Sequence, residues 1–157
     1  MNNEEYTIVK LQPGRSLPFD LLLLADETVK AIEKYIYDSD VYLVKQKYST
    51  DTIAAFALYR ISNAAIEIKN IAISESLQGQ GIGSNVMNEI KRIAITNHYK
   101  RIIVGTPEAS ARLIHFYEKN GFTRYAVRRD FFLKNYSDPI MENGVTLRNM
   151  VMLSLDL

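Results

Sequence analysis

The sequence Leu77-Gln78-Gly79-Gln80-Gly81-Ile82-Gly83-Ser84 separates an apolar, alternating stretch from a stretch with helical periodicity. Residues 66–73 therefore predict a strand, and residues 85–94 predict a helix. The three glycines leave the backbone bare, so consecutive N–H groups can point into one concave space. Because a helix N-terminus carries partial positive charge, this segment predicts an anion-binding site, for which phosphate is the best ligand.

Two common phosphate-binding motifs do not match this segment. A dinucleotide fingerprint requires G-x-G-x-x-G, and the third glycine here comes one residue early. A Walker loop requires a lysine after its last glycine, whereas Gly83 is followed by Ser84. A plain turn between a strand and a helix is the alternative interpretation of these residues alone.

Length and composition restrict the class of protein. The 157 residues suit a single domain, residues 1–157, and the net charge of +1 predicts neither nucleic acid nor a membrane as partner. The absence of cysteine excludes disulfides and a cysteine nucleophile, and it agrees with a cytoplasmic location. The polar start at residues 1–5 is unlike a signal peptide, and the longest apolar run, residues 21–25, is too short to span a membrane. No His, Asp or Glu cluster has metal-ligand spacing, so we expect no metal.

The remaining patterns predict an α/β (α+β) fold in which helices flank a mixed sheet. Asp26 is interpreted as the N-cap of a helix that buries Val29, Ile32 and Ile36. The apolar residues 150–153 either pair in a homodimer or lie within the sheet. The predicted strands cover residues 6–11, 41–47, 52–61, 66–73, 101–105, 122–131 and 145–155, and further helices cover residues 18–24, 85–94 and 110–120.

Two motifs carry a resemblance to a known family. Gln78-x-x-Gly81-x-Gly83 resembles the pyrophosphate loop of the GNAT superfamily of N-acetyltransferases, and Phe116-Tyr117-Glu118-Lys119-Asn120-Gly121-Phe122 resembles the signature F-Y-E-K-x-G-F of that family. The resemblance covers nearly the whole chain. It implies a mostly antiparallel sheet of six or seven strands, about four helices, and a splay between the fourth and fifth strands.

The same resemblance implies acetyl-CoA as co-substrate, with direct transfer to an amine. A bulged fourth strand would pair with the pantetheine amides through Ile71, Ala72 and Ile73. Ser110 is the nearest match to an asparagine that contacts the cofactor in many relatives. Backbone N–H groups would hold the pyrophosphate at Gln78, Gly79, Gln80, Gly81, Ile82, Gly83 and Ser84.

Acetyl transfer to an amine needs a neutral amine, a stabilised oxyanion and a hydrogen bond to the departing thiolate. Tyr117 matches the family tyrosine near the CoA sulfur, and a phenol with an ordinary pKa of about 10 can donate to a thiolate. Glu67 matches a glutamate that acts as general base in some relatives, and strand alternation predicts residues 67, 69 and 71 on one face. The alternatives are a core tyrosine at 117, and at 67 a solvated residue paired with Lys69, with water as the base. The oxyanion donor would be the N–H of Ile73.

The acceptor pocket is expected between the first two helices and residues 130–143. This segment combines the aromatic residues Phe131, Phe132 and Tyr136 with carboxylates that include Glu142, a mixture that suits a small amine with apolar bulk. The alternative is a packed cover over the sheet. The segment resembles the tail D-F-F-x-x-x-Y-x-x-P-I-x-E-N-G of a bacterial GNAT subgroup.

The leading hypothesis is therefore an acetyl-CoA-dependent N-acetyltransferase that acts on a small-molecule amine. The alternatives are acetylation of a protein N-terminus or lysine, a non-catalytic acyl-CoA-binding sensor, and an unrelated phosphate-binding domain. His115 and His98 are expected to take no part in catalysis. The pair Arg128-Arg129 is interpreted mainly as a solvated strand edge, although it could neutralise an acidic substrate.

Overall fold

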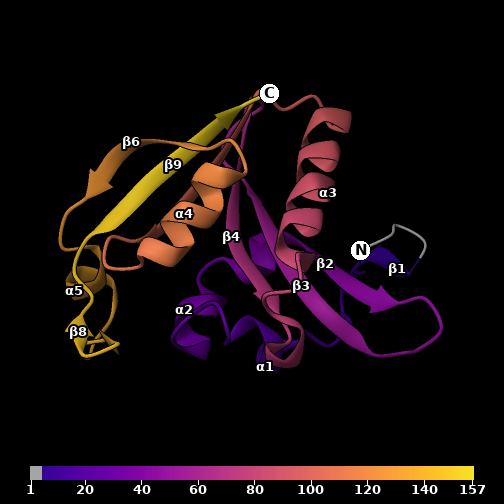
Figure 1. Ribbon diagram of the computed structural model, residues 1–157, viewed down its shortest axis with the longest axis horizontal. Helices are drawn as coiled ribbons and strands as arrows, with labels where there is room; N and C mark the ends of the chain where they lie inside the picture. Colours follow the sequence, from indigo (N-terminus) through magenta and orange to yellow (C-terminus); the bar gives the residue numbers. More distant parts are fainter. Residues whose placement is uncertain (1–4) are drawn as a thin grey trace.

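The structure, a computed structural model, describes residues 5–157 and contains one large sheet with helices on both sides (Figure 1). The seven strands follow the order β1-β2-β3-β4-β5-β9-β6, and only the pair β4–β5 is parallel. This arrangement confirms the predicted mixed, mostly antiparallel sheet. The strands are β1 (Tyr6–Lys10), β2 (Ser39–Gln46), β3 (Thr52–Arg60), β4 (Ala65–Ile73), β5 (Arg101–Pro107), β6 (Thr123–Arg128) and β9 (Met150–Asp156).

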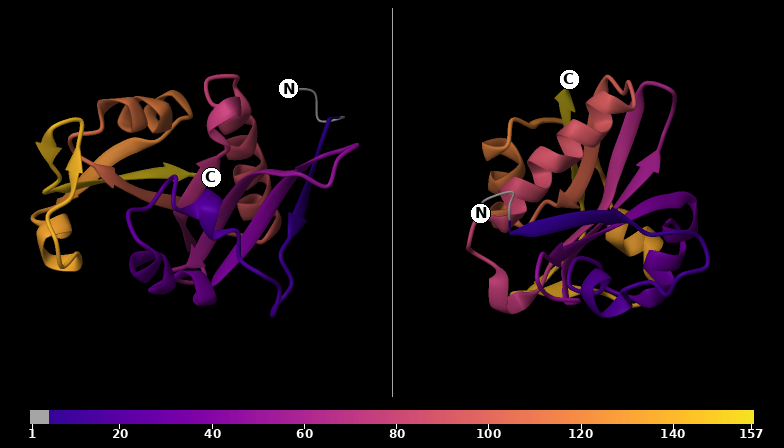
Figure 2. Two further views of the ribbon diagram at one scale, coloured as in Figure 1. Left: turned by 90° about the horizontal axis from the view of Figure 1, so that it is seen from below. Right: turned by 90° about the vertical axis from the view of Figure 1, so that its right-hand side faces the viewer.

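The helices divide between the two faces of the sheet. The left view of Figure 2 shows α3 and α4 on one side and α1, α2 and α5 on the other. The helices are α1 (Phe19–Leu22), α2 (Val29–Glu33), α3 (Ile82–Thr96), α4 (Ala111–Lys119) and α5 (Phe131–Asn135). Short 3-10 turns cover Ile36–Asp38 and Glu75–Leu77. The strands β7 (Met141–Glu142) and β8 (Val145–Thr146) pair as a small antiparallel hairpin apart from the large sheet.

Each face of the sheet has its own apolar core. Phe56 and Leu58 of β3 pack with buried residues of α3 such as Met87 and Ile90, while Ala55 and Ala57 contribute to a second cluster under α1 and α2. This division follows from the alternation of side chains along a strand. Burial of such large apolar side chains contributes about 1.5–3 kcal/mol each to the folded state.

The strands β4 and β5 separate after a short paired segment, as the family resemblance implied. Pairing runs only from Ala65–Arg101 to Ile68–Val104, although β4 continues to Ile73 and β5 to Pro107. Figure 1 shows the sheet opening into two halves below this point, one carrying α3 and the other carrying α4. The unpaired part of β4 leaves backbone groups facing a gap in the sheet.

A bulge in β4 overturns the expectation that residues 67, 69 and 71 share one face. Leu58 pairs with Ile68 and Ala57 pairs with Asn70, so Lys69 is an extra residue without a partner in β3. An inserted residue reverses the alternation beyond it. Glu67 therefore shares the face of Asn70, and Ile71 lies on the opposite face.

The second predicted helix differs from the prediction at its start and in its length. Thr28, rather than Asp26, caps α2, because its hydroxyl accepts a hydrogen bond from the backbone N–H of Ala31 at 3.0 Å. Val29 is 40% exposed, and Ile36 lies in the following 3-10 turn rather than in the helix. The predicted stripe of three buried residues is correct only for Ile32 and Ile36.

Two predicted strands near the C-terminus are too long. The strand expected to reach residue 131 ends at Arg128, because Asp130 adopts a positive φ of 55° and the chain turns into α5. The strand expected over residues 145–155 is divided into β8 and β9. Since β9 lies between β5 and β6, residues 150–153 lie within the sheet, the second of the two alternatives.

Two further expectations concern the N-terminal residues and membrane-spanning segments. The polar residues 1–4 lie outside the described residues, and so does most of the segment judged unlike a signal peptide. Among residues 5–157, no helix has the length and apolar character needed to cross a membrane.

Candidate active site

The glycine loop adopts the bare conformation that its sequence predicted. Gly79 and Gly81 have φ values of 77° and 81°, in the left-handed region that disfavours residues with a Cβ. Gly81 is the N-cap of α3, so the helix begins at Ile82, three residues before the predicted start. At Gly83 an added Cβ would lie 3.2 Å from the Phe116 ring, so this glycine permits α4 to approach.

The loop presents a series of free backbone donors. Within residues 5–157, the N–H groups of residues 79–84 have no protein acceptor, whereas the N–H of Gln78 donates to the carbonyl of Glu75 at 3.3 Å. The side-chain amide of Gln78 donates to the carbonyl of Ile73 at 3.0 Å and ties the loop to the end of β4. Gln78 therefore positions the loop, and its own N–H is already engaged.

A cavity of about 830 Å³ extends from this loop into the gap between β4 and β5. Its walls include Ile71, Ala72 and Ile73 of β4, the glycine loop, and Ser110 and Tyr117 of the α4 segment. The structure therefore brings together most of the residues predicted to bind the cofactor. Gln80 and Ile82 do not line the cavity, and the side chain of Ile82 is buried in the core. Ser110 is the N-cap residue of α4, and its side chain makes no capping hydrogen bond.

Tyr117 lies in the wall of this larger cavity and also belongs to the apolar core. Its side chain is 6% exposed and meets the rings of Phe116 and Phe122 edge to face, at centroid distances of 5.2 and 5.6 Å. Burial raises the pKa of the Tyr117 phenol, so the hydroxyl stays protonated at neutral pH. A place beside the CoA sulfur and a place in the core are the alternatives that the sequence predicts for Tyr117. The position of Tyr117 is compatible with both.

Glu67 occupies a second, smaller cavity of about 230 Å³. The residue is 5% exposed, so the expectation of a solvated side chain is wrong, while the expected pairing with Lys69 is present at 3.3 Å. The two cavities share the wall residues Ile68, Lys69 and Gly105. They therefore adjoin where β4 and β5 begin to separate.

A hydrogen-bonded chain connects the wall of the larger cavity to the wall of the smaller cavity. The Asn70 amide donates to the carbonyl of Leu22 at 3.0 Å and to the Tyr35 hydroxyl at 3.1 Å. Tyr35 and Tyr136 in turn donate to the two oxygens of Asp26, at 3.1 and 2.8 Å. Burial raises the pKa of both phenols and the Asp26 carboxylate raises it further, so both remain donors.

Asn70 is a site residue that the sequence interpretation missed. Because the Leu22 carbonyl can only accept, the amide orientation is fixed and its oxygen Oδ1 points the other way. This oxygen and the Thr106 hydroxyl are buried, and neither has a hydrogen-bond partner among residues 5–157. Both residues line the larger cavity. The available signal was a polar asparagine directly before the apolar residues 71–73 of the same strand.

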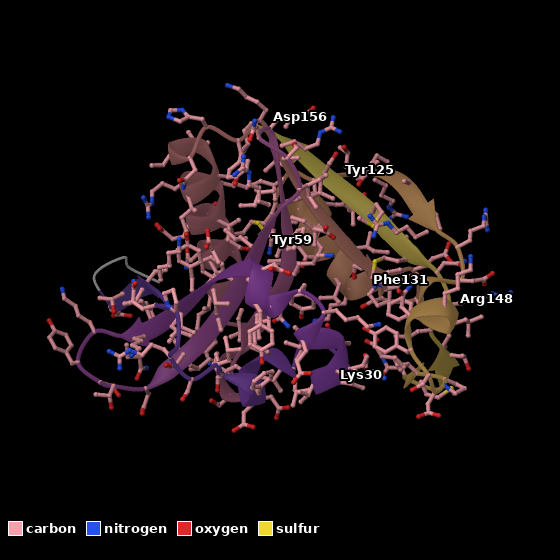
Figure 3. The ribbon with its side chains drawn as sticks, turned by 180° about the vertical axis from the view of Figure 1, so that it is seen from behind. Lys30, Tyr59, Tyr125, Phe131, Arg148 and Asp156 are labelled. Atoms are coloured by element: carbon pink, nitrogen blue, oxygen red, sulfur yellow. The ribbon has the colours of Figure 1, made fainter. Side chains whose placement is uncertain are left out.

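The predicted acceptor residues of the 130–143 segment separate into three positions. Phe131 and Tyr136 line the smaller cavity, and Figure 3 shows Phe131 on the inner side of this segment and Arg148 on its outer side. Phe132 is 5% exposed and packs between the other two rings, at centroid distances of 5.2 and 5.7 Å. Glu142 lines the larger cavity instead.

The two histidines and Arg128, which the sequence also singled out, all lie at exposed positions. His115 is exposed in the wall of the larger cavity, and His98 is an exposed residue with a positive φ of 65°. Arg128 is exposed on the edge strand β6, as the main interpretation predicted, and it also lines the smaller cavity. Within residues 5–157, no group of three or more His, Asp or Glu residues is arranged to hold a metal ion.

A splayed sheet, a glycine loop with free N–H groups and two adjoining cavities define an acyltransferase-type site. The family model for the Acetyltransferase (GNAT) family matches residues 13–122. The chain belongs to this family and is an acetyltransferase, which confirms the resemblance carried by the two motifs.

Individual relatives match almost the whole chain. A GNAT family acetyltransferase from Elizabethkingia anophelis, crystallised with acetyl-CoA, is 36% identical, with 98% of this chain and 99% of that chain covered and a TM-score of 0.92. A Bacillus subtilis acetyltransferase in complex with CoA is 31% identical, with 98% and 99% covered and a TM-score of 0.86. The uncharacterized N-acetyltransferase YvbK of Bacillus subtilis is 35% identical over 140 residues, 88% of each protein.

Proposed function

We propose that this protein transfers the acetyl group of acetyl-CoA directly to the amine of a small molecule. One observation carries the proposal: the larger cavity joins the glycine loop to Tyr117 and meets the small, acid-containing cavity at the splay of β4 and β5. A cofactor with a diphosphate, a long arm and a terminal thioester fits the first space. An amine fits the second.

The proposed cofactor position follows from the free donors. The N–H groups of residues 79–84 would bind the pyrophosphate at the N-terminus of α3. Backbone groups of Ile71 and Ala72 beyond the bulge would pair with the pantetheine amides, because β5 does not pair with this part of β4. The two relatives crystallised with acetyl-CoA or CoA support the identity of the cofactor.

The proposed chemistry uses one residue from each side of the splay. Tyr117, protonated because burial raises its pKa, would donate a hydrogen bond to the departing CoA thiolate. Glu67 would remove a proton from the amine, directly or through water, and the N–H of Ile73 would stabilise the oxyanion. The buried Oδ1 of Asn70 would accept a hydrogen bond from an incoming N–H group, which its present surroundings do not provide.

The size of the acceptor cavity favours a small molecule over a protein. A volume of about 230 Å³ lies below the range of about 300–1,000 Å³ typical of pockets for drug-sized ligands. The hydrogen bond from Tyr136 to Asp26 ties the 130–143 segment to the wall of this cavity, and we propose that the segment covers a bound acceptor. We propose the cytoplasm as the location, because the reaction requires acetyl-CoA as co-substrate.

The test is release of free thiol from acetyl-CoA with a panel of small amines and short peptides. We expect turnover with at least one small amine and no turnover of peptides through their N-terminus or lysines. Tight CoA binding without thiol release from any compound would favour a sensor. Absence of any CoA-induced thermal shift would contradict the proposed cofactor site itself.

A further inference from the structure

The strand register places Arg128 on the same face of the sheet as Glu67. Glu67 pairs with Ile103, and Gly105 lies two residues further along β5, so Glu67 and Gly105 share a face. Met150 of β9 pairs with Pro107 of β5 on one side and with Arg128 of β6 on the other. Because Pro107 lies two residues beyond Gly105, Arg128 points to the same face of the sheet as Gly105 and Glu67. Glu67 and Arg128 consequently enter the smaller cavity from different strands.

The charged groups of this cavity are occupied by protein partners with one exception. Lys69 pairs with Glu67 at 3.3 Å, and Lys34 donates to the carbonyl of Asn135 at 3.0 Å. Asp26 accepts the hydroxyls of Tyr35 and Tyr136. Among residues 5–157, no ion pair or side-chain hydrogen bond engages Arg128. The charged wall residues are Asp26, Lys34, Glu67, Lys69 and Arg128.

We infer that the acceptor is a small amine that also carries an acid group, and that Arg128 binds this acid group. The inference rests on the proposed function and specifies its substrate class. A guanidinium offers a planar fork of N–H donors that matches a carboxylate in a bidentate arrangement. The amine then points toward Glu67 and the junction with the larger cavity, where the thioester would lie.

The rest of the cavity wall limits the size and nature of the acceptor. The volume of about 230 Å³ equals roughly eight water molecules at about 30 Å³ each, which suits an acceptor of the size of an amino acid. Tyr35, Phe131 and Tyr136 add aromatic surface to the same wall. An amino acid with an apolar side chain therefore offers a group for each of these wall residues: its acid for Arg128, its amine for Glu67 and its side chain for the aromatic rings.

A diamine is the competing acceptor, with Asp26 binding its second ammonium group. The structure favours the acid-bearing acceptor because both oxygens of Asp26 already accept tyrosine hydroxyls, and Oδ1 also accepts the N–H of Glu27 at 2.7 Å. Asp26 thereby holds Tyr136 of the 130–143 segment against Tyr35, next to α2. Arg128 has no comparable role in the described structure.

The experiment compares matched acceptors and matched variants. Phenylalanine is compared with 2-phenylethylamine, 4-aminobutyrate with butylamine, and 1,4-diaminobutane is included. Each is assayed for kcat/KM by thiol release with the wild type, Arg128→Gln and Arg129→Gln. Arg129 is the control because it is an adjacent, exposed arginine that does not line the cavity. CoA affinity of each variant verifies its folding.

We expect the wild type to prefer the acid-bearing member of at least one pair by about 10-fold or more, as a charge-assisted hydrogen bond would produce. Arg128→Gln should lower kcat/KM for that member by about 10- to 100-fold and leave the acid-free amine unchanged. Arg129→Gln should change neither value. An equal effect of Arg128→Gln on both members, or a preference for the diamine, overturns the inference while the proposed function stands. Absence of thiol release with every amine overturns both.

Discussion

The two sides of the splayed sheet are built in different ways. The side with α3 and α4 relies on short local segments. These are the free N–H groups of one loop, residues 79–84, and Tyr117 of one helix. The side with α1, α2 and α5 collects Asp26, Glu67 and Tyr136 from distant parts of the chain. A cofactor shared by a whole family suits a local, backbone-based site. An acceptor that differs between relatives suits a site made of side chains.

The largest kinetic effect is expected for Tyr117→Phe. Loss of the hydrogen bond to the thiolate should lower kcat by about 100-fold, the lower range for general acid catalysis, and leave the Kd for CoA within about twofold. Steady-state kinetics and calorimetry measure the two quantities. A kcat within about twofold of wild type would assign Tyr117 to packing alone.

The pH dependence offers an independent check of the same residue. Burial raises the pKa of Tyr117 above its ordinary value near 10, so the protonated, donating form persists to higher pH. We expect kcat to show no decline from phenol ionisation between about pH 8 and pH 10. A decline in that range that disappears in Tyr117→Phe would contradict the raised pKa.

The glycine loop should govern cofactor binding specifically. Gly81 and Gly14 both have positive φ values, 81° and 82°, and open space around an added Cβ. Substitution of either by alanine imposes backbone strain of about 1–2 kcal/mol. We expect the loop of Gly81→Ala to relax out of this conformation without CoA, so that restoring it costs the strain energy and weakens CoA binding by about 20-fold. Gly14→Ala should leave the Kd unchanged. Equal Kd values for both variants would remove the loop from the cofactor site.

Glu67→Gln should reduce kcat/KM for the amine by about 10-fold at neutral pH, because the amide cannot accept a proton. The Kd for CoA should not change, since Glu67 lines the smaller cavity only. Measurement with several amines separates a base from a binding group. An unchanged kcat/KM would show that water alone removes the proton.

The smallest effect is expected for closure of the acceptor side. Tyr136→Phe removes the 2.8 Å hydrogen bond to Asp26 and should raise KM for the amine about fivefold, the value of one hydrogen bond of about 1 kcal/mol. Tyr125→Phe is the matched control because that side chain is 49% exposed on β6. Equal KM values in the two variants would assign no binding role to the contact.

The face assignment of Glu67 illustrates where sequence patterns fail. Strict alternation placed Glu67 and Ile71 together, and one inserted residue, Lys69, separated them. A bulge depends on pairing with β3, which is not visible in β4 alone. Asp26 was likewise assigned to a helix cap from its local surroundings, whereas it accepts hydrogen bonds from two tyrosines, one of them 110 residues away.

The sequence by itself determined the fold class, the glycine loop and the place of Tyr117, because these depend on local periodicity, backbone freedom and motifs of a few residues. Only the tertiary structure decided which side chains share the smaller cavity, which we propose for the acceptor. Asp26 and Arg128 meet Glu67 there through strand register and helix packing, and Asn70, in the wall of the larger cavity, is linked to Asp26 through Tyr35. Such contacts join residues far apart in the chain, and their energies depend on burial and geometry that no local pattern contains.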